Sequence, residues 1–228
     1  MSTVAEAAAE AEARAQLPEG PGERFAGYGV MGLPFSSGHV LAMRRFPASS
    51  VGPAYTSIWH RDPEGAWTFW QDQAAELACP RYFSAALAEA RQVRIGLTWT
   101  GPATLLLTVP ERAFTWSTTF RTSAVTTVLN GVGSILPDRW WRSDRVLSLL
   151  GPVAGAALRA GHVKLAGDVP NGQHFQANPL EVWLVAGSTA TLDGVDLGPP
   201  GPLDEQARLG DFWIPQRGVF AIGRAFFA

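Results

Sequence analysis

Short segments in which apolar and polar residues alternate, separated by frequent Pro and Gly turns, constrain the fold of this chain most strongly. In AFTWSTTFR, residues 113–121, the rings of Phe114, Trp116 and Phe120 recur at even spacing. Successive side chains of a β-strand point to opposite faces, so these three rings share one face of a predicted strand. Similar segments recur along the chain and predict about eight to ten strands, mostly antiparallel.

These strands favour a barrel, because a closed or nearly closed barrel leaves no exposed sheet edges. We therefore predict a mainly β fold, an antiparallel β-barrel that is lipocalin-like in general shape. The predicted strands are His39–Phe46, Tyr55–Arg61, Trp67–Trp70, Val93–Thr100, Thr104–Val109, Ala113–Arg121, His162–Asp168, Gln173–Asn178, Glu181–Leu192 and Gly218–Phe227.

Residues 122–160 differ in character from the rest, with apolar residues three and four positions apart. This spacing predicts a helical insertion of two or three helices, broken near Pro137 and Gly151-Pro152. Residues 1–24 are Ala/Glu-rich and end in a Pro/Gly break, which predicts a flexible or helical tail. We expect residues 25–228 to form a single β-barrel domain that contains the insertion.

Composition narrows the class of partner. The formal net charge is −2 and no Lys/Arg cluster occurs, which argues against nucleic acid or an anionic membrane as the main partner. Cys79 is the only cysteine, so the sequence predicts neither a disulfide framework nor a thiolate metal cluster. The start lacks a secretory pattern and no apolar run is long enough for a transmembrane segment, so we expect a soluble, cytoplasmic protein.

No motif predicts a cofactor. GYGVMG, residues 27–32, matches G-x-G-x-x-G, but a dinucleotide site needs a strand before it and a helix after it. Here PEGPGER precedes and Leu33-Pro34 follows, so we expect a glycine-rich turn. Phosphate-loop, zinc-protease, serine-hydrolase and EF-hand patterns do not occur, and the four histidines are far apart. We predict no cofactor and no metal.

The stretch WHRDPEGAWTFW, residues 59–70, predicts an aromatic hairpin around Asp62-Pro63-Glu64-Gly65. If Arg61 pairs with Ala66, then His60 faces Trp67 and Trp59 faces Thr68. Both faces then hold large side chains, which either pack as core or line a ligand cavity beside a titratable histidine. The predicted faces are Ile58, His60, Trp67 and Phe69 on one side, and Tyr55, Ser57, Trp59, Arg61, Thr68 and Trp70 on the other.

A second hairpin is predicted at Asn171-Gly172, where a two-residue turn would pair Val169 with His174. His174, Gln176 and Asn178 then line one face, which is either a polar pocket wall or an exposed strand. On the opposite face Lys164, the only lysine, could pair with Asp168.

Arg224 belongs to the last predicted strand and shares a face with Phe220, Ile222 and Phe226. A buried charge needs a partner, so Arg224 either forms a salt bridge, with Asp211 or another carboxylate, or anchors a ligand carboxylate or enolate.

These features together predict a barrel that binds a small, largely apolar or aromatic molecule, covered by the helices of 122–160. It acts either as a non-catalytic carrier or as a cofactor-independent isomerase, cyclase or hydratase (a lyase). An alternative is a protein-interaction module that uses Trp140 and Trp141 of the insertion. The ligand and the oligomeric state stay open. Candidate catalytic residues are His60, His174 and Arg224, and candidate ligand-binding residues are Tyr55, Trp59, Trp67, Phe69, Trp70, Gln176 and Asn178.

Overall fold

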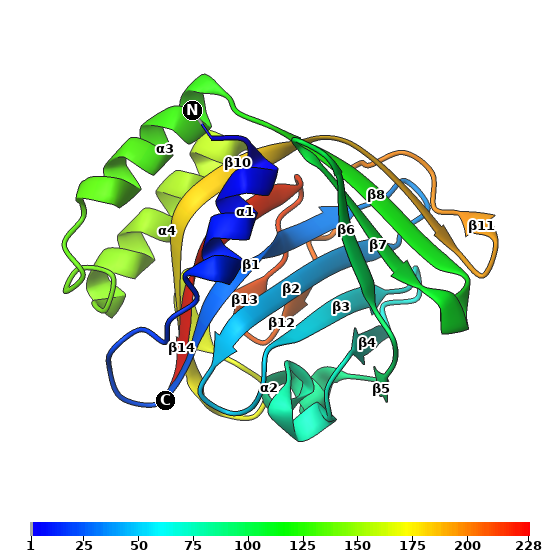
Figure 1. The fold of residues 1–228 in the computed structure, drawn as a ribbon, viewed down its shortest axis with the longest axis horizontal. Helices are drawn as coiled ribbons and strands as arrows, with labels where there is room; N and C mark the ends of the chain where they lie inside the picture. The colour runs from blue at the N-terminus through cyan, green and yellow to red at the C-terminus, as the bar shows by residue number, and fades with distance from the viewer. Residues whose placement is uncertain (1) are drawn as a thin grey trace.

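A computed structural model describes residues 2–228, and one curled sheet dominates it (Figure 1). The strands follow the order β5-β4-β3-β2-β1-β14-β10-β8-β7-β6, with β9 and β11 added on β10. Their bounds are β1 Glu23–Pro34, β2 Val40–Ser49, β3 Tyr55–Arg61, β4 Trp67–Gln71, β5 Glu89–Gln92, β6 Gly96–Gly101, β7 Thr104–Val109, β8 Phe114–Arg121, β9 Ala166–Asp168, β10 His174–Leu192, β11 Val195–Asp196 and β14 Val219–Phe227.

The remaining elements lie on the faces and edges of this sheet. The strands β12 (Arg208–Leu209) and β13 (Phe212–Trp213) form a separate two-stranded sheet. The helices are α1 Val4–Ala13, α2 Pro80–Phe83, α3 Ala124–Ile135 and α4 Asp144–Leu158, and the 3-10 turns are η1 Ala75–Leu77, η2 Ser84–Ala86 and η3 Pro110–Arg112. None of the helices in residues 2–228 has the length and apolar character needed to cross a membrane.

The mainly β prediction is confirmed, but the sheet is a curled half-barrel and not the predicted closed or nearly closed antiparallel barrel (Figure 1). The strand order ends at β5 on one side and β6 on the other, and no ladder within residues 2–228 joins these two edges. β5 also pairs with β4 in parallel, because the chain crosses over through α2 before it returns. The sheet is therefore mixed and open.

Both predicted hairpin registers are wrong by one residue. Arg61 pairs with Trp67, and Asp168 pairs with His174. Each turn has three central residues and ends in a glycine with positive φ, +99° at Gly65 and +88° at Gly172. The extra turn residue exchanges the two faces of the returning strand. Tyr55, Ser57, Trp59, Trp67 and Phe69 therefore share one face, and Ile58, His60 and Trp70 share the other.

The segment GYGVMG lies inside β1, a strand that the sequence did not predict. A side chain at Gly27 would place its Cβ 2.0 Å from the Arg45 carbonyl oxygen of β2, so glycine is required for the close approach of these strands. The glycine-rich pattern therefore reflects strand packing, and the predicted turn at this position is wrong.

The two faces of the sheet carry separate cores. One core includes Tyr28, Met43, Trp116 and Phe220, and α1 covers part of it with Val4, Ala7 and Ala8. Glu12 fastens α1 to this face, because its carboxylate accepts hydrogen bonds from the Tyr28 hydroxyl at 3.0 Å and from Arg45 Nε at 2.8 Å. The second core, on the opposite face, includes Phe25, Tyr55, Trp59, Phe69, Tyr82, Phe83, Phe175 and Leu209.

The predicted helices of residues 122–160 are α3 and α4, which lie together outside β10 and β14 (Figure 1). The side-chain amide of Asn130 holds α3 to β10, accepting from Val182 N at 2.8 Å and donating to Val182 O at 3.1 Å. The predicted break at Gly151-Pro152 is wrong, because α4 continues through Pro152. Pro152 is exposed, so water can solvate the carbonyl that its missing N–H leaves unpaired.

Candidate functional site

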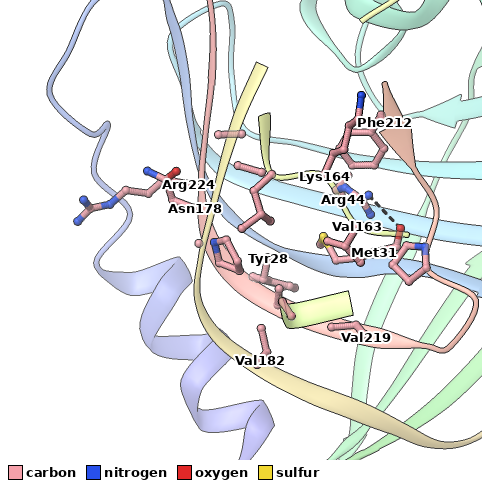
Figure 2. A pocket seen from close by; sticks show the side chains of 18 of the residues that line it. Tyr28, Met31, Arg44, Val163, Lys164, Asn178, Val182, Phe212, Val219 and Arg224 are labelled. Atoms are coloured by element: carbon pink, nitrogen blue, oxygen red, sulfur yellow. Dashed lines mark hydrogen bonds between the residues drawn. The ribbon is translucent and has the colours of Figure 1, made fainter. Parts of the chain in front are cut away.

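A cavity of about 220 Å³ lies between the second core face of the sheet and the α3–α4 helices. Figure 2 shows side chains that line it, among them Arg44 and Phe212. Most of its wall is apolar, so it suits a ligand with a substantial apolar part. The sheet contributes Phe25, Phe46, Tyr55, Trp59, Ala221 and Phe227, the helices contribute Leu129, Leu136, Leu150 and Leu158, and Phe212 and Trp213 of β13 close one side.

Arg44 of β2 is the buried charge in this wall. Its position follows from strand alternation, since Val40, Ala42 and Arg44 point to the same face of β2. The guanidinium lies over the ring of Trp59, 4.5 Å from its centroid, and 5.5 Å from that of Phe212. Such stacking favours a cation over an aromatic face.

Three backbone carbonyls accept hydrogen bonds from this guanidinium. Arg44 Nη1 donates to Val30 O at 2.6 Å and to Met43 O at 2.8 Å, and Nη2 donates to Met31 O at 3.2 Å. No carboxylate within residues 2–228 forms an ion pair with Arg44. Burial lowers the pKa of Arg44 to about 10, so it remains charged at neutral pH.

Two weakly acidic side chains lie beside Arg44 in the cavity wall. The Tyr55 hydroxyl is 3.5 Å from Cys79 Sγ, and both residues are buried. Burial raises the pKa of the Tyr55 phenol and of the Cys79 thiol, so both are neutral at physiological pH. Trp59 Nε1 is buried without a hydrogen-bond partner among the described residues. The cavity therefore offers neutral hydrogen-bonding groups around one buried cation.

Lys164 also borders the cavity, but its charge is already paired. Its Nζ lies 2.6 Å from Asp211 Oδ1, so the suggested pairing with Asp168 is wrong. The hydrogen bond from Lys164 lowers the pKa of the Asp211 carboxyl. Both side chains are partly exposed, which places this ion pair at the rim.

The three predicted catalytic residues do not form one cluster. His60 Nε2 is 2.8 Å from His39 Nδ1, its ring stacks on Trp70, and it does not line the cavity. Burial and the neighbouring His39 lower its pKa to about 4. The predicted facing of His60 and Trp67 is wrong, because His60 pairs with Thr68 and lies on the same face of the hairpin as Trp70.

His174 and Arg224 are also engaged elsewhere. His174 Nδ1 is 2.8 Å from Asp168 Oδ1 and Nε2 is 3.2 Å from Asp144 Oδ2, and the hydrogen bond to Asp168 raises the pKa of His174. Arg224 borders the cavity, but its guanidinium points away from Arg44 (Figure 2) and lies 3.5 Å from Asp138. The salt-bridge alternative for Arg224 matches this contact.

The predicted ligand-binding residues divide into two groups. Tyr55, Trp59 and Asn178 line the cavity, and Asn178 approaches the Trp141 carbonyl from β10. Gln176 donates to Asp144 outside the cavity. Trp67, Phe69 and Trp70 are buried in the two cores and do not line the cavity.

Arg44, the main polar group of the site, was not among the predicted residues. A signal for it was present, because Arg44 shares the alternate positions of a predicted strand with Val40 and Ala42. The same argument singled out Arg224 in the last strand.

Comparisons with known proteins give a limited result. No protein-family model matches the chain, and no curated protein matches it. Two solved structures resemble it at 12% identity and cover 92% of this chain. They are an acetoacetate decarboxylase from Legionella pneumophila, with a TM-score of 0.40 over 86% of that chain, and a second acetoacetate decarboxylase, with a TM-score of 0.43 over 88%. Such similarity concerns the path of the chain and carries nothing about activity.

Proposed function

We propose that this chain binds a small, largely apolar molecule with one anionic group, and that the cavity around Arg44 is the binding site. The observation that carries the proposal is a buried, charged guanidinium with no carboxylate partner within residues 2–228. Carbonyl dipoles solvate this charge only in part, and a buried charge without a counter-charge is costly. A ligand anion would offset that cost.

Arg44 has N–H donors that could bind such an anion. A guanidinium has five N–H donors, and the three described bonds leave two without an acceptor. Arginine binds carboxylates through paired, charge-assisted hydrogen bonds. The apolar part of the ligand would contact Trp59, Phe212 and the inner sides of α3 and α4. Aryl-alkyl carboxylates combine a carboxylate for Arg44 with an apolar part for the cavity wall.

The geometry favours binding over acid–base turnover. The cavity-lining Tyr55 and Cys79 are held neutral by burial, and Lys164 is paired with Asp211. His60 and His174, the two histidines expected to transfer protons, have partners outside the cavity. We therefore place the carrier function first and the cofactor-independent isomerase, cyclase or hydratase second.

Isothermal titration calorimetry with hydrocinnamate and hydrocinnamyl alcohol tests the role of charge. These two molecules have the same ring and chain length and differ in the carboxylate. We expect Arg44→Met to weaken hydrocinnamate binding at least about tenfold, since hydrogen bonds to charged groups contribute roughly 1.5–3 kcal/mol, and to leave alcohol binding nearly unchanged.

Controls separate this effect from misfolding. Arg94→Met removes an exposed arginine from another part of the chain and should not alter binding. Leu150→Trp narrows the cavity from α4 and leaves Arg44 in place, so it should weaken the binding of both ligands. Equal affinity of the wild type for the two ligands, unchanged by Arg44→Met, would refute the proposal.

A further inference from the structure

The outer sides of α3 and α4 carry large aliphatic side chains that no other part of the described chain covers. Val128 is 64% exposed, Ile135 78%, Leu149 71% and Val153 61%. On α3 the exposed residues Val125, Val128, Val132 and Ile135 are three or four positions apart, and on α4 Leu149 and Val153 are four apart. Each helix therefore presents one apolar stripe. The helices α3 and α4 form a helical hairpin, and we call these six residues its hairpin face.

The segment that carries the hairpin face is basic. Residues 121–160 contain five arginines and two aspartates, although the whole chain has a net charge of −2. Both aspartates have basic partners, Arg224 for Asp138 and His174 for Asp144. The arginines form no ion pair with any described carboxylate; they are Arg121, Arg139, Arg142, Arg145 and Arg159.

The arginines and a tryptophan lie close to the apolar stripes. Arg145 is one helical turn before Leu149 on α4, so it extends the stripe of that helix. Trp140 lies between the two helices, is 46% exposed and follows Arg139 directly. Exposed aliphatic residues bordered by arginines and a tryptophan are typical of helices that lie in the plane of a membrane surface.

We infer that the hairpin face docks on an anionic phospholipid surface. Its aliphatic side chains would enter the boundary of the acyl chains, and the unpaired arginines would contact the lipid phosphates. A symmetric contact between two copies would bring the same basic segments together, and the like charges would oppose it. This inference departs from the expectation based on net charge, because the overall value of −2 includes a locally basic segment.

The cavity wall and the hairpin face share Val132 and Val153, which are both exposed and cavity-lining. Docking would therefore place one wall of the cavity next to the lipid. The docking inference itself depends only on the outer side of the helices and does not require a ligand in the cavity.

Vesicle flotation of the full chain tests the inference. We expect the protein to float with vesicles of phosphatidylcholine mixed with phosphatidylserine, and to remain largely unbound with phosphatidylcholine alone. The Arg139→Gln, Arg145→Gln double variant should lower the partition coefficient on the mixed vesicles at least about tenfold. High salt should weaken the wild-type binding, since exposed charges are screened.

A second pair of variants tests the apolar contribution. The double variant Ile135→Ser, Leu149→Ser should abolish flotation, and neither residue lines the cavity. Val195→Ser is the matched control, because Val195 is 65% exposed on β11, away from the helices. Arg44→Met should float like the wild type, so a failure of the ligand proposal is distinguishable from a failure of docking.

Two outcomes would overturn the inference. One is wild-type protein that stays unbound to the mixed vesicles. The other is a wild-type dimer by analytical ultracentrifugation that becomes monomeric in Ile135→Ser with Leu149→Ser, with no vesicle binding by either form. The hairpin face would then be an interface between copies of this chain.

Discussion

A buried cation beside an apolar cavity is the most informative residue-scale feature of this molecule. Arg44 is placed there by strand alternation, stacks on Trp59 and is solvated by backbone carbonyls of β1 and β2. Part of its role is structural, because two of these carbonyls belong to the irregular stretch of β1 between Val30 and Leu33. Its two remaining N–H groups are the donors available to the proposed ligand.

His60 is a second buried titratable residue, with a different consequence. It contacts His39 on the face of the sheet opposite the cavity. Burial and the neighbouring His39 lower its pKa to about 4, so its imidazole is neutral at neutral pH. The imidazole of an unfolded chain has a pKa of about 6.5. The unfolded state therefore binds a proton at a higher pH than the folded state does.

The expected result is a loss of stability in mild acid. The contribution of His60 to the free energy of unfolding is complete above about pH 6.5. It is lost as the pH falls towards 4, because the imidazole of the unfolded chain then binds a proton more readily than that of the folded chain. Urea unfolding at several pH values should show the free energy of unfolding of the wild type falling by roughly 2 kcal/mol more than that of His60→Gln over this range. His162→Gln, which replaces an exposed histidine, should behave like the wild type. An equal decline in His60→Gln and the wild type would rule out this explanation.

Among the elements, α3 and α4 cover the cavity and are called the lid here, and one side-chain amide fixes this lid to the sheet. Asn130 bonds both the N–H and the carbonyl of Val182, and Gly133 lets α3 approach β10 so closely that a Cβ there would lie 2.9 Å from Leu180 O. These contacts hold the inner side of α3 against the cavity. The position of the lid thus depends on a few specific contacts as well as on apolar packing.

Removing that amide should weaken the attachment of the lid. Asn130→Ala leaves the Val182 N–H and carbonyl without their partner, so we expect the free energy of unfolding to fall by about 1–3 kcal/mol. Ser134→Ala is the matched control on the same helix, because its hydroxyl is exposed and bonds only Gly131 O, and it should change stability by less than about 0.5 kcal/mol. The measurement is urea denaturation, and equal stabilities of the two variants would contradict the anchoring role.

The elements also show which parts of the fold could be predicted from the sequence. β3 and β7 have the predicted bounds, because alternation and turn residues are local signals. The hairpin registers could not be predicted as reliably, since Gly65 and Gly172 each end a turn that is one residue longer than expected. That single residue moved Trp67 and Phe69 from the predicted face of His60 to the face of Tyr55 and Trp59.

At the scale of the whole molecule, the strand count suggested a barrel, but the strand order produces an open half-barrel. Closure depends on whether β5 and β6 meet, and that pairing has no local signature in the sequence. The cavity likewise depends on long-range placement, because Arg44, α3, α4 and β13 are far apart along the chain. Tyr55, Trp59 and Asn178 were predicted from their hairpins. Arg44 was not, although it shares alternate strand positions with Val40 and Ala42, because its place in the cavity wall depends on the distant helices that cover it.

A crystal structure of the protein soaked with para-bromohydrocinnamate would show whether the cavity around Arg44 binds such a ligand, because bromine is located by its anomalous signal. We predict a bromine peak between Trp59 and the inner sides of α3 and α4, with the carboxylate within hydrogen-bond distance of the Arg44 guanidinium. The same soak of Arg44→Met should give no peak there. A wild-type cavity without the probe at saturating concentration, or a probe bound with its carboxylate directed away from Arg44, would contradict the proposed binding site.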